Sequence, residues 1–377
     1  MKRIIIIGFV WLMAAGVSAQ QVQQRDVLEI ARKVNGYFMK KYADPTKPTN
    51  VGRIRPSNLW TRGVYYEGLM ALYEIDADKR YLDYTDSWAD FHQWTARNGI
   101  KTCHADDQCC EQTYLDRYMM TREERMIEHV RENLDQQMKT KIGWWTWIDA
   151  IQMSMPVYSK MYRATDEQKY IDHAMKMYTW SRDTLAGGLF NAAEGLWWRD
   201  QDYVPPYQEP DGKNCYWSRG SGWVYAALVR VLSDLQAMPK NKTTKRYYKQ
   251  LKRDFVLMSA ALLSCQREDG LWNASLVSTN YEGKELTGTS LFLYGFSWGI
   301  RNKILKAKDY EEACHRAWKG LVRDCVHRDG FLGYVQGTGK DPSAGQPVTY
   351  TKVPDFEDYG TGCFLLGAVE YYKMLLF

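Results

Sequence analysis

Residues 62–88 read RGVYYEGLMALYEIDADKRYLDYTDSW, and residues 147–178 read WIDAIQMSMPVYSKMYRATDEQKYIDHAMKMY. Each stretch carries apolar residues every three to four positions, then a short polar turn with Asp, then a second periodic stretch. This spacing is typical of amphipathic helices, because positions three and four apart share one helix face. Each stretch therefore predicts a helical hairpin, and related units begin near Arg219, Thr287 and Asp358.

The same period extends outward from these units over almost the whole chain, whereas alternating strand patterns are rare. We expect helices near residues 24–41, 65–76, 79–98, 106–120, 122–139, 147–163, 167–184, 221–237, 245–265, 288–304, 309–327 and 358–376. Paired in order, they predict an all-α toroid, an (α/α)6 barrel, with helices antiparallel to their neighbours. No Pro-, Ser- or Gly-rich linker divides residues 20–377, so we expect one domain there.

In such a toroid, the inner helices begin on one rim, and the loops before them form a shared funnel. Gly-rich helix starts such as RGSGW (219–223) and TGTS (287–290) should let the chain turn tightly there. The longest loop, residues 187–217, is rich in aromatic residues, and long ordered loops are often functional.

The first 19 residues predict a secretory signal peptide. Lys2 and Arg3 precede an apolar run over residues 4–15, and Val17-Ser18-Ala19 is a small-residue cleavage site. No segment is long enough to span a bilayer. We therefore expect a periplasmic or secreted protein with no membrane partner.

Charge and cysteine patterns exclude other classes of protein. The net charge of +5 comes from scattered Lys and Arg, so nucleic acid is not an expected partner. The eight cysteines match no zinc spacing, and six of them fall in predicted helices, where Cys usually packs as a small apolar residue. Disulfides are an option in an oxidising compartment but are not required by the predicted fold.

The stretch WSRGSGW, residues 217–223, stands directly before the helical pattern VYAALVRVL. One interpretation is a surface of Trp217 and Trp223 on which a sugar ring stacks, with Arg219 as the cation for a carboxylate. The other is a tight turn packed by aromatic residues. The stretch alone does not decide between them.

Two acidic sites could carry chemistry. Asp106 and Asp107 start a predicted helix in CHADDQCCEQTYLD, next to His104, and Asp149 follows GWWTWI in the first turn of another. Helix capping explains a single Asp in such a place. However, apolar surroundings such as the indoles before Asp149 raise a carboxyl pKa, as a general acid requires.

Other catalytic patterns are missing from the sequence. The six His residues show no HExxH spacing, and neither a GxSxG elbow, a GxGxxG loop nor a P-loop occurs. We expect neither a metal nor an organic cofactor.

The sequence resembles the unsaturated uronyl hydrolases of glycoside hydrolase family 105, which are related to family 88. RGSGW resembles the RGNGW motif of that family, and residues 147–174 are similar to the segment carrying its catalytic Asp. ELTGTSLFLYGFSWGI (285–300) and DYGTGCFLLGAVEYYKML (358–375) resemble its last inner helices. The resemblance covers nearly the whole chain after the signal peptide, and it implies an (α/α)6 barrel.

The resemblance also implies a reaction and its residues. The substrate is an oligosaccharide left by a polysaccharide lyase, with a C4=C5 double bond in its terminal uronic acid. Asp149 would protonate C4, and water oriented by Asp149, Asp106 or Asp107 would add at C5. The resulting hemiketal opens and releases the next sugar.

The same resemblance implies that Arg219 and Trp223 contact the substrate, and Arg199 is a further candidate in place of the missing family His discussed below. Arg219 or Arg199 would hold the carboxylate, and tryptophan rings would stack on the sugar. The candidates for stacking are Trp145, Trp198, Trp217 and Trp223.

One departure bears on the substrate. Pectin-type members carry a His in the loop before RGNGW, where this chain has LWWRD, residues 196–200. We therefore favour a β-linked unsaturated glucuronyl unit, as in ulvan-type or other rhamnose-containing acidic glycans. The alternatives are an unsaturated rhamnogalacturonyl hydrolase, an inverting glycosidase of saturated substrates, and a sugar-binding toroid without catalysis.

Overall fold

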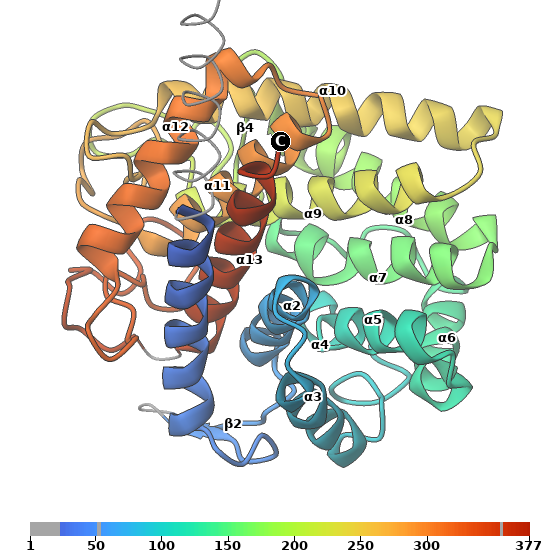
Figure 1. The fold of residues 1–377 in the computed structure, drawn as a ribbon. Helices are drawn as coiled ribbons and strands as arrows, with labels where there is room; N and C mark the ends of the chain where they lie inside the picture. The colour runs from blue at the N-terminus through green and yellow to red at the C-terminus, as the bar shows by residue number, and fades with distance from the viewer. Residues whose placement is uncertain (1–22, 51–53, 355–356) are drawn as a thin grey trace, which may run out of the picture.

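The computed structural model describes residues 23–50, 54–354 and 357–377. The predicted signal peptide lies outside these residues. Twelve main helical segments alternate between an inner and an outer ring of the described chain (Figure 1). This confirms the predicted all-α toroid.

The inner helices are α2 (Trp60–Ile75), α5 (Glu111–Thr121) preceded by the short α4 (Ala105–Gln108), α7 (Asp149–Thr165), α9 (Ser218–Ala237), α11 (Leu286–Arg301) and α13 (Asp358–Met374). The outer helices are residues 23–41, α3 (Lys79–Phe91), α6 (Glu128–Gln137), α8 (Gln168–Asp183), α10 (Lys242–Ser264) and α12 (Ala307–Gly320). Short 3₁₀ turns span Glu124–Met126 and Leu185–Gly187, and a π turn spans Leu321–Cys325. The described residues also form two short antiparallel strand pairs: β1 (Thr49–Asn50) with β2 (Ile54–Arg55), and β3 (Phe190–Asn191) with β4 (Leu196–Trp197).

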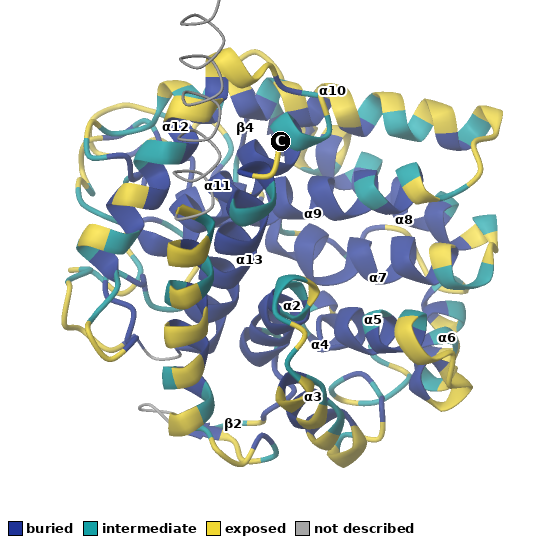
Figure 2. Ribbon diagram, viewed as in Figure 1, coloured by how far each residue is buried: buried dark blue, intermediate teal, exposed yellow. Residues whose placement is uncertain are grey.

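Burial explains which helices lie inside. Residues 149–162 of α7 and 218–232 of α9 are all buried, and a helix buried on every side must lie within the molecule. The outer helix α10 instead alternates buried and exposed residues along its length (Figure 2). An exposed face thus marks the outer helices, and nearly continuous burial marks the inner ones.

The inner ring closes between α2 and α13, the first and last inner helices. The helix over residues 23–41 runs antiparallel beside α13 (Figure 1): Gln23 bonds to Tyr371 at 3.0 Å, and Lys41 pairs with Glu357. Both ends of the described chain therefore contribute to closing the toroid.

Inner helices run parallel to one another, which confirms the predicted common rim and corrects the expectation that every helix is antiparallel to all its neighbours. Gly222 and Tyr225 of α9 face Gly288 and Gly295 of α11, in the same order along both helices. Antiparallel packing holds only between an inner helix and the outer helix paired with it. As a result, all inner helices begin on one rim.

Gly220, Gly222 and Gly288 correct a second expectation, because they sit inside helices and make no tight turns. A Cβ on Gly222 would lie 2.9 Å from Leu291 Cδ1, and one on Gly288 would lie 2.2 Å from Ser218 Oγ. The missing side chains therefore allow close packing between inner helices.

A buried ion pair crosses the ring. Glu67 in α2 and Arg230 in α9, three places apart among the six inner helices, are joined at 2.8 Å. Gln152 of α7 also donates to Glu67 at 2.9 Å. We call this group, Glu67, Arg230 and Gln152, the cross-brace, and it occupies the axis of the barrel below the rim.

Candidate active site

The candidate site lies at the start of α7, where the long loop 187–217 is docked. The N–H of Ile148 donates to the carbonyl oxygen of Arg199 at 2.9 Å, and Trp147 pairs with Asp200 as an isolated β-bridge. These contacts bring the Arg199 guanidinium to Asp149, with 3.2 Å between Nε and Oδ2. Its Nη1 also donates to Asp200 Oδ2 at 2.5 Å.

The two neighbouring acids of α4 have different surroundings. Asp107 is buried, and its carboxylate accepts hydrogen bonds at 2.6–3.0 Å from Arg97, Asn98 and Thr102. These hydrogen bonds hold the preceding loop in place and use both carboxylate oxygens of Asp107. The Asp106 side chain is a quarter exposed and accepts no comparable set of hydrogen bonds. Asp106 is therefore the better candidate for the second acid, a choice that the sequence left open.

Asp106 and Asp149 influence each other's protonation. Burial raises the pKa of Asp149, while the cations of Arg199 and Arg219 lower it. Burial, followed by repulsion from Asp149 and Asp107, raises the pKa of Asp106 to about 7. The two carboxyls therefore form a coupled pair in which both pKa values lie above that of an ordinary aspartate, so that the pair can hold a proton near neutral pH.

Arg219 lies behind the carboxyl pair and is fully buried. Its Nη1 and Nη2 donate to the backbone carbonyls of Gln336 and Gly337, each at 2.8 Å. Its guanidinium packs 4.5 Å from the ring of Trp217 and 5.2 Å from that of Tyr359. The motif arginine thus fixes the loop after α12 over the rim and adds positive charge near Asp149.

The predicted stacking residues divide into two groups. Three are packed in the interior with 0–1% of their surface exposed: Trp145, Trp217 and Trp223. Trp217 donates its Nε1 to Gln336 Oε1 at 2.8 Å, so its ring is anchored beneath the loop. Of the four predicted stacking residues, Trp198 is the one partly open to solvent.

Sequence reasoning missed two partly exposed indoles at this rim. Trp60 is the first residue of α2, 5.4 Å from the ring of Tyr359, and Trp147 lies 4.9 Å from the ring of His104. Both stand in or just before a first helical turn, the position that singled out Trp217. That signal could have found them. Nothing in the sequence pointed to Gln336. One of its roles is to accept a hydrogen bond from Arg219 through its backbone carbonyl, which any residue could do.

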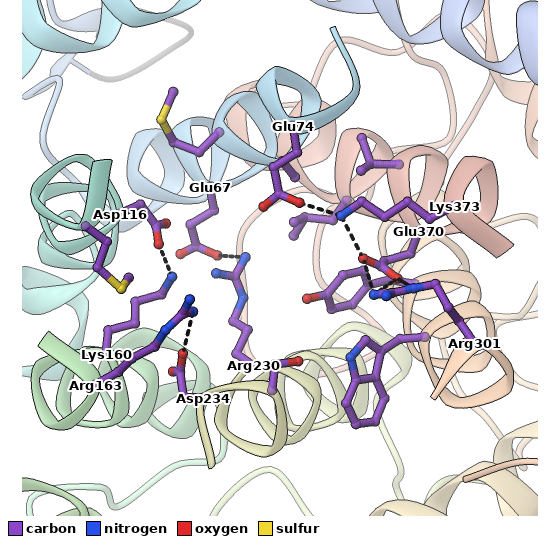
Figure 3. A pocket seen from close by; sticks show the side chains of 18 of the residues that line it. Glu67, Glu74, Asp116, Lys160, Arg163, Arg230, Asp234, Arg301, Glu370 and Lys373 are labelled. Atoms are coloured by element: carbon purple, nitrogen blue, oxygen red, sulfur yellow. Dashed lines mark hydrogen bonds and ion pairs between the residues drawn. The ribbon is translucent and has the colours of Figure 1, made fainter. Parts of the chain in front are cut away.

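A charged cavity of about 440 Å³ lies below the cross-brace, in the second half of the inner helices (Figure 3). Its lining residue Lys160 follows Asp149 in α7 by eleven residues, about 16 Å along the helix. Its charges are paired with each other: Lys160 with Asp116, and Arg301 with Glu370 at 2.9 Å. A cavity whose charges are satisfied internally is a weaker candidate than the rim.

Metal and thiol chemistry find little support in the described part of the chain. It contains no cluster of three or more His, Cys, Asp or Glu side chains placed to hold a metal ion. All eight cysteines are free, and burial raises the pKa of the Cys110 thiol to about 12, so that thiol is a poor nucleophile. None of the helices described is both long and apolar enough to cross a bilayer.

Comparison with known proteins finds a matching family. The model of Glycosyl Hydrolase Family 88 matches residues 30–375. An unsaturated 3S-rhamnoglycuronyl hydrolase from Formosa agariphila is 30% identical over 339 residues, covering 84% of each chain.

Solved structures agree as well. A glycosyl hydrolase family 88 protein from Bacteroides vulgatus has a TM-score of 0.83 at 31% identity, covering 93% of this chain and 99% of its own. A possible member of family 105 from Salmonella enterica has a TM-score of 0.72 at 20% identity, covering 93% and 94%, a likeness of fold alone.

Proposed function

Because the chain belongs to glycosyl hydrolase family 88, we propose that it removes the terminal 4,5-unsaturated glucuronic acid from lyase-generated oligosaccharides. Membership makes it a glycoside hydrolase of the unsaturated glucuronyl type. The finer substrate in our proposal is a glucuronyl–rhamnose unit of an ulvan-type acidic glycan. The name of the Formosa agariphila relative, and Arg199 in place of the pectin-type His, support that choice.

The observation that carries the mechanism is the carboxyl pair beside Arg199. The pKa of Asp106 is raised to about 7, so this carboxyl can carry a proton near neutral pH, and the Arg199 guanidinium lies 3.2 Å from Asp149. When the substrate carboxylate pairs with Arg199, it weakens the attraction that lowers the pKa of Asp149. The pKa of Asp149 then rises, and the proton passes to it from Asp106.

The proposed reaction then proceeds by hydration. Asp149 gives its proton to C4, and the ring oxygen stabilises the cation at C5. Asp106, now ionised, takes a proton from water as the water oxygen bonds to C5. The hemiketal opens to a keto acid and releases the next sugar, while the proton taken from water remains on the carboxyl pair.

Asp149→Asn tests this proposal. Asn keeps the size, and Asp149 is the first residue of α7 rather than its N-cap, so the variant should fold. General acid catalysis is worth about 10² to 10⁴ in rate, and we expect a loss at or beyond the upper end. Asp83→Asn, an exposed change on α3, is the matched control and should keep full activity.

The assay separates hydration from ordinary glycosidase chemistry. The conjugated C4=C5 carboxylate absorbs in the ultraviolet, and hydration removes that band. In heavy water the product should carry deuterium at C4. A substrate cut while the band persists would instead indicate attack at the anomeric carbon, as in an inverting glycosidase.

A further inference from the structure

The residues one helical turn after the two acids of the candidate site lie close to the cross-brace. Gln152, a member of it, follows Asp149 by three residues in α7. Cys109 follows Asp106 by the same interval, and its backbone is still helical. Residues three apart on a helix share one face and are separated by about 4.5 Å along its axis. Gln152 and Cys109 therefore each lie beneath one carboxyl of the pair.

Both of these residues donate a hydrogen bond to Glu67 of α2. Its Oε2 accepts from Gln152 Nε2 at 2.9 Å, and its Oε1 accepts from Cys109 Sγ at 3.4 Å. Burial, followed by the charge of Glu67, raises the pKa of the Cys109 thiol well above its ordinary value, so the thiol stays protonated and can donate. The carbonyl oxygen of Trp60, also in α2, is a second acceptor for Sγ at 3.6 Å. One carboxylate thus joins the two helix starts that carry the acids.

Arg230 supplies the charge that this arrangement requires. Burial raises the pKa of Glu67, and the Arg230 cation, 2.8 Å away, opposes that rise (Figure 3). The ion pair therefore favours the ionised form of Glu67, in which both oxygens accept hydrogen bonds. Both side chains are buried, so water does not compete for these bonds.

Two further bonds join the same helices without involving Glu67. Gln112 of α5 donates to the backbone carbonyl of Gln152 at 2.8 Å, and Ser154 of α7 donates to Gln108 of α4 at 2.7 Å. These bonds hold α7 against α4 and α5. Glu67 adds a connection from both helix starts to a third inner helix, α2.

We infer that Glu67 is a positioning residue that sets the separation of the two acids through its bonds to the turn beneath each. The inference rests on the proposed function and adds a residue that acts on the reaction without touching the substrate. The separation matters because the proton passes between the acids, and because repulsion from Asp149 contributes to the raised pKa of Asp106. A displacement of about 1 Å in a catalytic group can lower a rate by about 100-fold.

The test removes each bond while leaving Glu67 paired with Arg230, since an unpaired buried charge would itself disrupt folding. Cys109→Ala removes the bond to α4, and Gln152→Met, of similar size, removes the bond to α7. Each variant should lose about 10- to 100-fold in kcat with little change in KM. The alkaline limb of the kcat/KM profile should move to lower pH, because acids released from Glu67 move apart and repel each other less.

Three further variants separate positioning from a purely structural role. Cys109→Ser keeps a donor and should restore most of the activity. In the double variant Cys109→Ala/Gln152→Met, the second substitution should add little, because either one already breaks the common anchor. Ser159→Ala, which removes a buried 2.6 Å bond to Asp234 farther along α7, is the matched control and should lose stability but keep kcat and the pH profile. Losses that multiply in the double variant, or an unchanged pH profile in both single variants, would overturn the inference.

Failure of the proposed function has a different outcome. If the wild type leaves the ultraviolet band of every unsaturated disaccharide intact, the hydration proposal fails, whatever the variants do. Crystal structures then decide the role of Glu67. The separation of the Asp106 and Asp149 carboxyls should be larger in Cys109→Ala and Gln152→Met than in the wild type and Cys109→Ser. Equal separations in all four proteins would reject the inference.

Discussion

Asp106 loses its proton near neutrality because burial and the Asp149 carboxylate both disfavour its charge. Its folded-state pKa, about 7, stands above the value of about 4 expected in the unfolded chain. Between about pH 4 and pH 7 the folded protein keeps a proton that the unfolded chain has lost. Stability from this group is therefore full below about pH 4 and declines as pH rises to about 7.

Asp106→Asn removes that pH dependence, so the variant should gain stability over wild type as pH rises. We expect similar Tm values at pH 4 and a variant more stable by about 4 kcal/mol at pH 8. Activity should fall steeply, because the carboxyl pair has lost a member. Thermal unfolding across this pH range measures the effect, and a Tm difference that stays constant would contradict the assigned pKa.

Arg199 lowers the pKa of both Asp106 and Asp149. Arg199→Ala should therefore move the alkaline limb of the kcat/KM profile to higher pH. It should also reduce kcat/KM by about 10- to 100-fold, the worth of a hydrogen-bonded charge on the substrate carboxylate. Unchanged kcat/KM on the best substrate would remove Arg199 from substrate recognition.

Between elements, glycine sets how closely α2 and α13 approach. A Cβ on Gly362 would lie 2.2 Å from the carbonyl oxygen of Val64, a backbone atom that cannot move aside alone. Gly362→Ala should therefore destabilise the fold by about 1–3 kcal/mol. Gly36→Ala is the matched control, in an exposed helix position with nothing within 4 Å of the new methyl. It should stabilise by about 0.5–1 kcal/mol. Urea unfolding measures both, and similar values would contradict the packing argument.

The sequence predicted most helices to within a few residues, because periodicity is a local property of each segment. It also located Asp149, the acids of α4 and Arg199, since each stands at a helix start or in the long loop. It could not choose between Asp106 and Asp107, because that choice depends on bonds from Arg97 and Thr102 in the folded loop.

The sequence also could not show that Trp217 and Trp223 are buried. An aromatic residue beside glycine has the same local pattern whether its ring faces a ligand or a neighbouring helix. Only the contact between Trp217 and Gln336, 119 positions apart along the chain, distinguishes the two.

At the scale of the whole molecule, the cross-brace closes the barrel below the rim. Because Glu67 and Arg230 join opposite sides of the ring, a polysaccharide cannot thread through the barrel. Only a chain terminus can reach Asp149, and both products must leave by the mouth through which the substrate entered. The enzyme should therefore cut each oligosaccharide once, at its terminus, because the shortened chain no longer carries the C4=C5 double bond. On substrates lengthened at the reducing end, we expect the keto acid from the terminal unit and the shortened chain alone at every time point. Internal fragments detected by mass spectrometry would show that the barrel is open to a passing chain.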